Sequence, residues 1–363
     1  MRITENRKNN KIAIMILVVM CVIITIPIVI KMYNSFSSAL NGSSVFEYTV
    51  NSDKTTCTIT GLVSGVEQEN IEIPSEIKKY TVTAIAQSAF EGSKIKTVII
   101  PSTVKSIGKR AFANCKSLYA VYGLENCTEI MQIQNETFLC CNSLEYLKLP
   151  PNIVYIGEKA FIECSSIEIF EFPANLKTID YAAFLGCSAL SKLNFPQGLK
   201  KIETSFGNCY SLIEVTIPSS VEKLSSGAFM GCRGLKNIYV DDDNNYFISI
   251  DGIIYDKNKE MLWIYPSGKI ENHFDISNKI RVLADCSFAF NNNIESINIS
   301  QSVTRLGKQI FWGSKNLKTI NYTGTVQQWF DIVKDNDWNY ESSDFIVFCT
   351  NGQIEKDGTV TYK

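Results

Sequence analysis

One pattern constrains this chain more than any other, because it returns along most of its length. Residues 161–173 read FIECSSIEIFEFP, residues 184–196 read FLGCSALSKLNFP, and residues 206–218 read FGNCYSLIEVTIP. The period is 22 or 23 residues. Self-similarity at a fixed period of this size indicates a solenoid of stacked coils. The chain of 363 residues is therefore expected to form one continuous stack, not two ordinary globular domains.

Nine copies of the pattern align on one phenylalanine: Phe90, Phe112, Phe138, Phe161, Phe184, Phe206, Phe229, Phe288 and Phe311. Leu or Ile follows six residues later in eight of the copies, and Ile95 follows five residues after Phe90. The x-Val-x-Ile-Pro alternation that comes next has the period of a strand and predicts one short strand per copy. One more aliphatic residue stands four or five residues before each Phe, for example Ile156 and Ile179.

The predicted fold class is a repeat solenoid with about 23 residues per coil and a parallel sheet on its concave face. A β cap at 48–70 precedes the repeats, which occupy 71–322. An interval of 59 residues between Phe229 and Phe288 contains an inserted β excursion at about 241–272. A cap with a short helix and closing strands is expected at 323–363. Capping is needed because the terminal coils have a neighbour on one side only.

The first residues of the chain predict export. Residues 12–30 form 19 consecutive residues without a charge, enough for one transmembrane helix, and follow a basic cytoplasmic tail at 1–11. A stalk at 31–47 would link this signal-anchor to the body. The expected location is the cell membrane, single-pass, with the C-terminal body extracellular. The alternative is secretion after cleavage of a signal peptide near Ser37-Ser38-Ala39, although 12–30 is longer than a usual signal core.

Three motifs resemble one known family. They are the repeated Ala-Phe-x-x-Cys-x-x-Leu-x-x-Leu-x-Ile-Pro, the Ile-Asp-Gly-Ile-Ile-Tyr run at 250–255, and Gly-Thr-x-x-Gln-Trp at 324–329. Over roughly residues 48–352 they look like the BspA-like (Treponema-type) leucine-rich repeat family. The resemblance implies a curved solenoid and a surface-exposed protein that takes part in adhesion, and it supplies no catalytic residues. Ser93, Asn291 and Ser314 depart from the repeated Cys.

Six of the twelve cysteines occupy one repeat position, three residues after the Phe: Cys115, Cys141, Cys164, Cys187, Cys209 and Cys232. Stacked coils would place them about 4.8 Å apart, within the range of a disulfide. An inward-facing position favours a structural ladder of buried thiols instead, because a thiol packs like a small apolar group. Cys57, Cys127, Cys140 and Cys349 fall outside this register.

The sequence provides little support for catalysis, metal binding or nucleic-acid binding. His273 is the only histidine and is expected in an exposed loop, which removes most nucleophile–base and His–metal schemes. Residues 241–245 read DDDNN and begin like a calcium loop, but Tyr246 stands where the turn needs Gly, so a plain solvated turn is expected. Residues 32–363 hold 30 basic and 36 acidic side chains, which argues against nucleic acid as a partner. We expect no enzyme activity, no cofactor and no metal.

The outward positions of the strands are the predicted binding surface, because solenoids use this extended face. They are Tyr119, Tyr122, Glu145, Tyr146, Lys148, Glu168, Glu171, Lys192, Asn194, Glu214, Lys236 and Tyr239. Aromatic residues among charges of both signs are typical of protein recognition. The sequence thus predicts a membrane-anchored surface protein that binds a host or matrix protein. The alternative is a structural or envelope-organising surface protein without a dedicated ligand.

Overall fold

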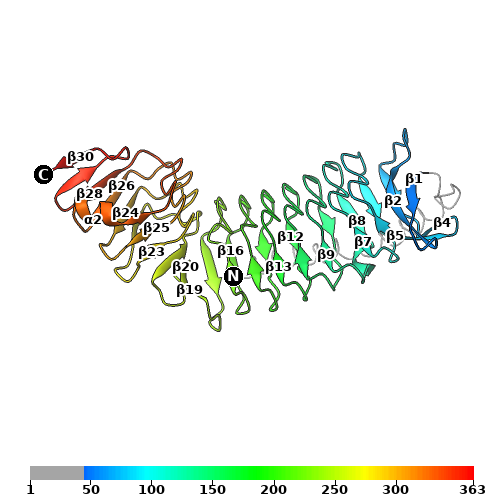
Figure 1. Cartoon of the computed structure of the whole chain (residues 1–363), viewed down its shortest axis with the longest axis horizontal. Coiled ribbons are helices and arrows are strands. Elements are labelled where there is room, and N and C mark those ends of the chain that lie inside the picture. The colour runs from blue at the N-terminus through cyan, green and yellow to red at the C-terminus, as the bar shows by residue number, and fades with distance from the viewer. Residues whose placement is uncertain (1–44) are drawn as a thin grey trace, which may run out of the picture. The chain divides into compact units, whose positions relative to one another are not determined.

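A computed structural model describes residues 45–363. The predicted tail at 1–11, the predicted transmembrane segment at 12–30 and the stalk as far as residue 44 lie outside the described residues. Within 45–363, no helix is long and apolar enough to span a bilayer. In this part of the chain the coils follow one another in sequence order, as the colours of Figure 1 show.

Each coil contributes two strands, not the single strand expected from the alternation, and these strands form two ladders. The first ladder contains β3 (Asn70–Glu72), β6 (Thr97–Ile99), β8 (Ala120–Tyr122), β10 (Tyr146–Leu147), β12 (Ile169–Phe170), β14 (Lys192–Leu193), β16 (Glu214–Ile217), β18 (Asn237–Val240), β22 (His273–Asp275), β24 (Ser296–Ile299), β26 (Thr319–Tyr322) and β28 (Ile346–Cys349). Paired neighbours within it run parallel, in four successive sheets.

The second ladder precedes the Phe of each coil. It contains β5 (Tyr80–Ile85), β7 (Ser106–Ile107), β9 (Gln132–Ile133), β11 (Tyr155–Ile156), β13 (Thr178–Ile179), β15 (Lys201–Ile202), β17 (Lys223–Leu224), β21 (Met261–Ile264), β23 (Val282–Leu283), β25 (Arg305–Leu306) and β27 (Val333–Lys334). Most of these strands are two residues long, for example β11, so they show no alternation that a sequence could reveal.

The aligned phenylalanines form a buried column of rings. Successive rings from Phe90 to Phe229 stack with centroids 5.2 to 5.6 Å apart. The residues around the column Phe form a third side of each coil, where backbone hydrogen bonds join it to the next coil. Phe161 N donates to Ala183 O, and Glu163 N donates to Leu185 O. Glu163 has φ 59°, and the same position in the next coil is Gly186, which reaches positive φ at less cost.

The insertion forms a hairpin and then rejoins the stack. Strand β19 (Phe247–Ile250) pairs antiparallel with β20 (Ile253–Asp256), and β20 pairs antiparallel with β21, which already belongs to the second ladder. Tyr265 follows and stacks on Phe288 with centroids 4.9 Å apart. Tyr265 therefore takes the ring position of one further coil.

Different elements close the two ends. Near the start, β1 (Phe46–Val50) pairs with β2 (Thr56–Leu62), β2 joins β5, and β4 (Glu76–Ile77) also pairs with β5. Within the stack, and not at either end, a short 3-10 helix η2 (Leu124–Asn126) follows β8. Near the C-terminus, α2 (Val326–Asp331) begins with a capping box between Thr325 and Gln328, and β29 (Gly352–Ile354) and β30 (Val360–Tyr362) extend β28 antiparallel.

Candidate functional site: the face of the first ladder

The register of the first ladder decides which side chains face outward. Val98 pairs with Val121, and both are buried. The flanking positions, such as Thr97 and Ile99, point the other way because side chains alternate along a strand. Most coils therefore present two outward positions in this register, although Ala120 of β8 is buried. The residue just before the strand, such as Lys96, is exposed as well. We call this surface the strand face.

The structure places all twelve predicted binding residues on the strand face. Eleven are exposed and Tyr122 is half-buried. They occupy three columns. The residues before the strand are Tyr119, Glu145, Glu168 and Lys236, and those at its first outward position are Tyr146, Lys192 and Glu214. The third column, at the second outward position of the strand or directly after its end, contains Tyr122, Lys148, Glu171, Asn194 and Tyr239. In residues 45–363, no ion pair involves any of their seven charged side chains, so these charges remain available to a partner.

Three aromatic side chains on this face form a group, which we call the tyrosine cluster: Tyr119, Tyr122 and Tyr146. The rings of Tyr122 and Tyr146 lie with centroids 5.1 Å apart and planes tilted by 36°. Burial raises the pKa of Tyr122, and the neighbouring Tyr119 and Tyr146 raise it further. Tyr119 is 44% exposed and Tyr146 is 37% exposed. Large aromatic area therefore faces solvent at one place on the ladder.

Two apolar residues of the strand face were missed by the sequence analysis. Ile169 is 63% exposed and Ile213 is 61% exposed. Ile169 is the first residue of β12, and Ile213 directly precedes β16. The repeat spacing places both outward, but aliphatic residues next to a strand are more often read as core. They extend the apolar part of the strand face beyond the tyrosine cluster.

The six cysteines at the repeat position are buried and free in this structure. Each Sγ donates to the carbonyl oxygen of the ring-column Phe one coil earlier, for instance Cys187 to Phe161 O at 3.1 Å and Cys232 to Phe206 O at 3.0 Å. Ser314 makes the same bond to Phe288 O at 2.7 Å. Burial raises the pKa of Cys164 well above its usual value, so this thiol stays protonated and unreactive.

His273 is exposed as expected, but it lies in strand β22 and not in a loop. The prediction was wrong about the element, because the inserted segment hides the repeat spacing that would have identified this strand. Its Nδ1 lies 2.7 Å from Ser296 Oγ, and its Nε2 lies 3.2 Å from Asp275 Oδ1. Hydrogen bonds on both nitrogens hold the ring on the strand face.

The acidic run at 241–245 folds as a turn around one buried residue. Asn244 donates to Pro218 O and Val221 O, and its Oδ1 accepts from the backbone N–H groups of Tyr246 and Phe247. Within residues 45–363, no group of three or more His, Cys, Asp or Glu side chains is arranged to hold a metal ion.

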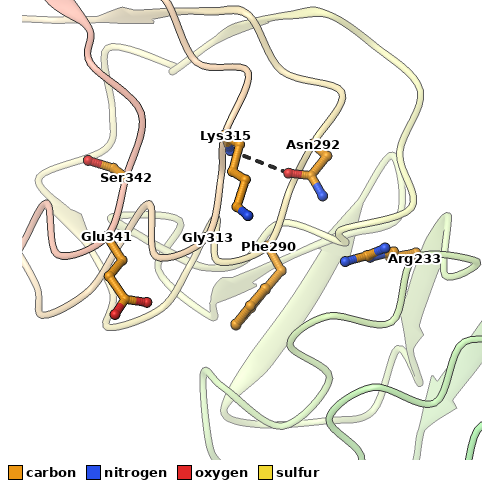
Figure 2. A pocket seen from close by; sticks show the side chains of 7 residues that line it. All are labelled: Arg233, Phe290, Asn292, Gly313, Lys315, Glu341 and Ser342. Atoms are coloured by element: carbon orange, nitrogen blue, oxygen red, sulfur yellow. Dashed lines mark hydrogen bonds between the residues drawn. The ribbon is translucent and has the colours of Figure 1, made fainter.

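A hollow of about 490 Å³ lies among turns of coils that precede and follow the inserted hairpin (Figure 2). Arg233, Phe290, Lys315 and Glu341 line it, and Lys315 N donates to Asn292 Oδ1. The Trp312 indole donates to Glu341 and lowers the pKa of that carboxyl. No predicted binding residue lines this hollow.

Among curated protein sequences, none matches the chain significantly. Solved structures do share its fold. A leucine rich cell surface protein from Faecalibacterium prausnitzii is 22% identical, with a TM-score of 0.65 over 80% of this chain and 97% of that chain. A leucine-rich repeat protein from Bacteroides ovatus is 22% identical, with a TM-score of 0.58 over 77% of this chain and 70% of that chain. The pneumococcal vaccine antigen PcpA is 20% identical, with a TM-score of 0.53 over 85% of this chain and 86% of that chain.

A family model described as BspA type leucine rich repeat region (6 copies) matches residues 62–132, 131–249 and 265–333. These segments cover most of both ladders. The gap at 250–264 falls on the second strand of the hairpin and on β21, where the spacing of the repeat changes. The chain belongs to the BspA-type leucine-rich repeat family.

Proposed function

We propose that this protein is displayed on a bacterial cell surface, anchored through residues 12–30, and binds another protein through the strand face. Adhesion to a host or matrix protein is the form of binding that we propose. The family supports a surface location, and the related Faecalibacterium protein is itself described as a cell surface protein. On the strand face Ser296 contacts His273, but this histidine is exposed to solvent, and the family resemblance supplies no catalytic residues, so we propose binding and not catalysis.

The tyrosine cluster is the observation that carries this proposal. Aromatic side chains dominate the energy of protein interfaces, because they bury a large area at a small cost in conformational entropy. Tyr122 and Tyr146 are already in contact, so binding would not need to bring them together. Unpaired charges of both signs surround the cluster, for example Glu145 and Lys148, and would add specificity at the rim.

Replacing Tyr119, Tyr122 and Tyr146 together by Ser tests the proposal. We expect cells that display the variant to lose adhesion to immobilised matrix proteins, with affinity reduced at least tenfold, because the loss of aromatic hot spots typically costs about 2 kcal/mol or more. The measurement is adhesion of intact cells that produce the full chain, together with surface labelling of the same cells. Labelling that fails to reach the wild-type protein would contradict the surface location.

The matched control replaces Tyr181, Tyr210 and Tyr340 by Ser. These residues are 50%, 47% and 44% exposed, like the cluster, but lie in turns away from the strand face. Adhesion should survive this change. Equal adhesion by both triple variants would overturn the strand-face proposal. A pull-down with the wild-type ectodomain that recovers no partner would favour the alternative, a structural or envelope-organising protein without a dedicated ligand.

A further inference from the structure

The C-terminal part of the strand face differs in chemistry from the tyrosine cluster. In β22, β24, β26 and β28 the second outward position holds Asp275, Asn298, Asn321 and Phe348, which are neighbours in register. A groove of about 360 Å³ is lined by the first three of these residues and by Thr323 and Ser300. Phe348 is not part of its lining and lies one register position beyond Asn321. Figure 1 shows three of these strands (β24, β26 and β28) in the orange-to-red part of the chain.

Hydrogen bonds between neighbouring coils hold these side chains in a row, which we call the amide ladder: Asp275, Asn298 and Asn321. Asn321 Nδ2 donates to Asn298 Oδ1 at 2.8 Å, and Asn298 Nδ2 donates to Asp275 Oδ1 at 2.6 Å. Among the described residues, Asp275 Oδ2 and Asn321 Oδ1 have no hydrogen-bond partner, and one N–H of Asn321 is also unused. The amide ladder is thus fixed in geometry and still offers both acceptors and a donor to the groove.

The balance of charge selects the class of ligand. Asp275 is the only carboxylate of the amide ladder and is 74% exposed, which disfavours an anion. The nearby Lys318 is engaged by Glu295 at 2.7 Å. A metal ion would find one free carboxylate oxygen and few other oxygens, whereas hard cations need six or more ligands. A hydroxyl group both donates and accepts, so it matches what the amide ladder leaves open.

We propose that the amide ladder and its groove bind a neutral polyhydroxyl ligand, a glycan chain that runs along the ladder. Successive sugar hydroxyls would pair with Asp275, Asn298 and Asn321, and the half-buried ring of Phe348 would contact the apolar face of a sugar. Coils about 4.8 Å apart repeat the polar groups at intervals close to the size of one sugar ring. This site is separate from the tyrosine cluster and does not depend on it.

Titration calorimetry of the full-length protein with neutral oligosaccharides tests the proposal. The probes are hexamers of glucose, mannose, galactose and N-acetylglucosamine, with heparin and polysialic acid as charged comparators. We expect at least one neutral probe to bind and the charged ones to bind more weakly. The double variant Asn298→Ala/Asn321→Ala should weaken that binding at least tenfold.

A second variant keeps the test decisive if the double variant loses structure. Phe348→Ala leaves the hydrogen bonds of the amide ladder intact and should also weaken sugar binding at least tenfold. Asn194→Ala, at the equivalent outward position directly after β14, should leave it unchanged, and so should the triple tyrosine variant. The proposal is overturned if no neutral probe binds at millimolar concentration, if only charged probes bind, or if Phe348→Ala binds like the wild type.

Discussion

At the scale of single residues, the buried thiols serve as hydrogen-bond donors. Their partners are the carbonyl oxygens of the ring-column phenylalanines, as in Cys141 to Phe112 O at 3.1 Å. Any small donor satisfies this geometry, and Ser314 does so in a later coil. Regular cysteine spacing in this chain therefore reflects a repeated packing position and does not indicate a redox site.

Thiol reactivity should separate the cysteines into two groups. Cys140 and Cys286 are partly exposed, whereas the other described cysteines are buried. We expect an alkylating reagent to label these two first in the native protein. Burial and the nearby Asp285 raise the pKa of Cys286 to about 11, so its labelling should accelerate as pH rises toward that value, because the thiolate is the reactive form. Mass spectrometry after timed labelling measures the order.

The control is the double variant Cys140→Ala/Cys286→Ala, whose remaining cysteines within residues 45–363 should label very slowly until the protein is unfolded. Unfolding without reductant should then expose the six cysteines at the repeat position as free thiols. Six protected sulfurs would mean that disulfides replace the thiol ladder.

At the scale of elements, the repeat predicted the first ladder but not the second. The alternation after Leu190 is long enough to read as a strand, while Thr178–Ile179 of β13 shows only one buried residue. Pairing with a neighbouring coil makes β13 a strand, and that partner is distant in sequence. The same limit applies to Tyr265, whose role in the ring column is hidden because the hairpin precedes it. The outward placement of the twelve predicted binding residues could be read from the sequence because outward positions follow directly from the strand period; that these residues bind a partner stays a prediction.

The stability of the turn at 241–245 is expected to depend on one buried residue, Asn244. Replacing the buried Asn244 by Ala removes four hydrogen bonds and leaves buried backbone groups of two coils unpaired. We expect a loss of about 3 kcal/mol in the free energy of unfolding, measured with urea. The neighbouring Asn245 is exposed, and its replacement by Ala should change stability by no more than about 0.5 kcal/mol.

Calcium provides a further check on this turn. Because Asn244 already hydrogen-bonds the backbone groups of this turn, added calcium should leave the urea midpoints of both the wild type and Asn245→Ala unchanged. A higher midpoint in calcium would show that the acidic run is a metal site after all.

At the scale of the whole molecule, each coil takes its stability from its neighbours. Leu190 is fully buried, and Leu190→Ala should cost roughly 2 to 5 kcal/mol. Ile213→Ala, at a residue 61% exposed, should stay within about 0.5 kcal/mol of the wild type. Hydrogen exchange should show the largest loss of protection in β12, β14 and β16, and a smaller loss farther along the stack. A Leu190→Ala variant that unfolds with the wild type would contradict this account.

The backbone hydrogen bonds on the third side of each coil affect how the number of repeats in such a chain can change during evolution. The hydrogen bond from Phe161 N to Ala183 O is repeated one coil later by the bond from Phe184 N to Ser205 O. Each coil therefore offers its neighbours the same backbone donors and acceptors as the next coil does. Duplication or deletion of one repeat unit in the gene would lengthen or shorten the stack by one layer and keep the pattern of backbone hydrogen bonds between coils. The extent of the proposed binding surface would therefore be set by copy number, while its specificity would be set by substitution at outward positions.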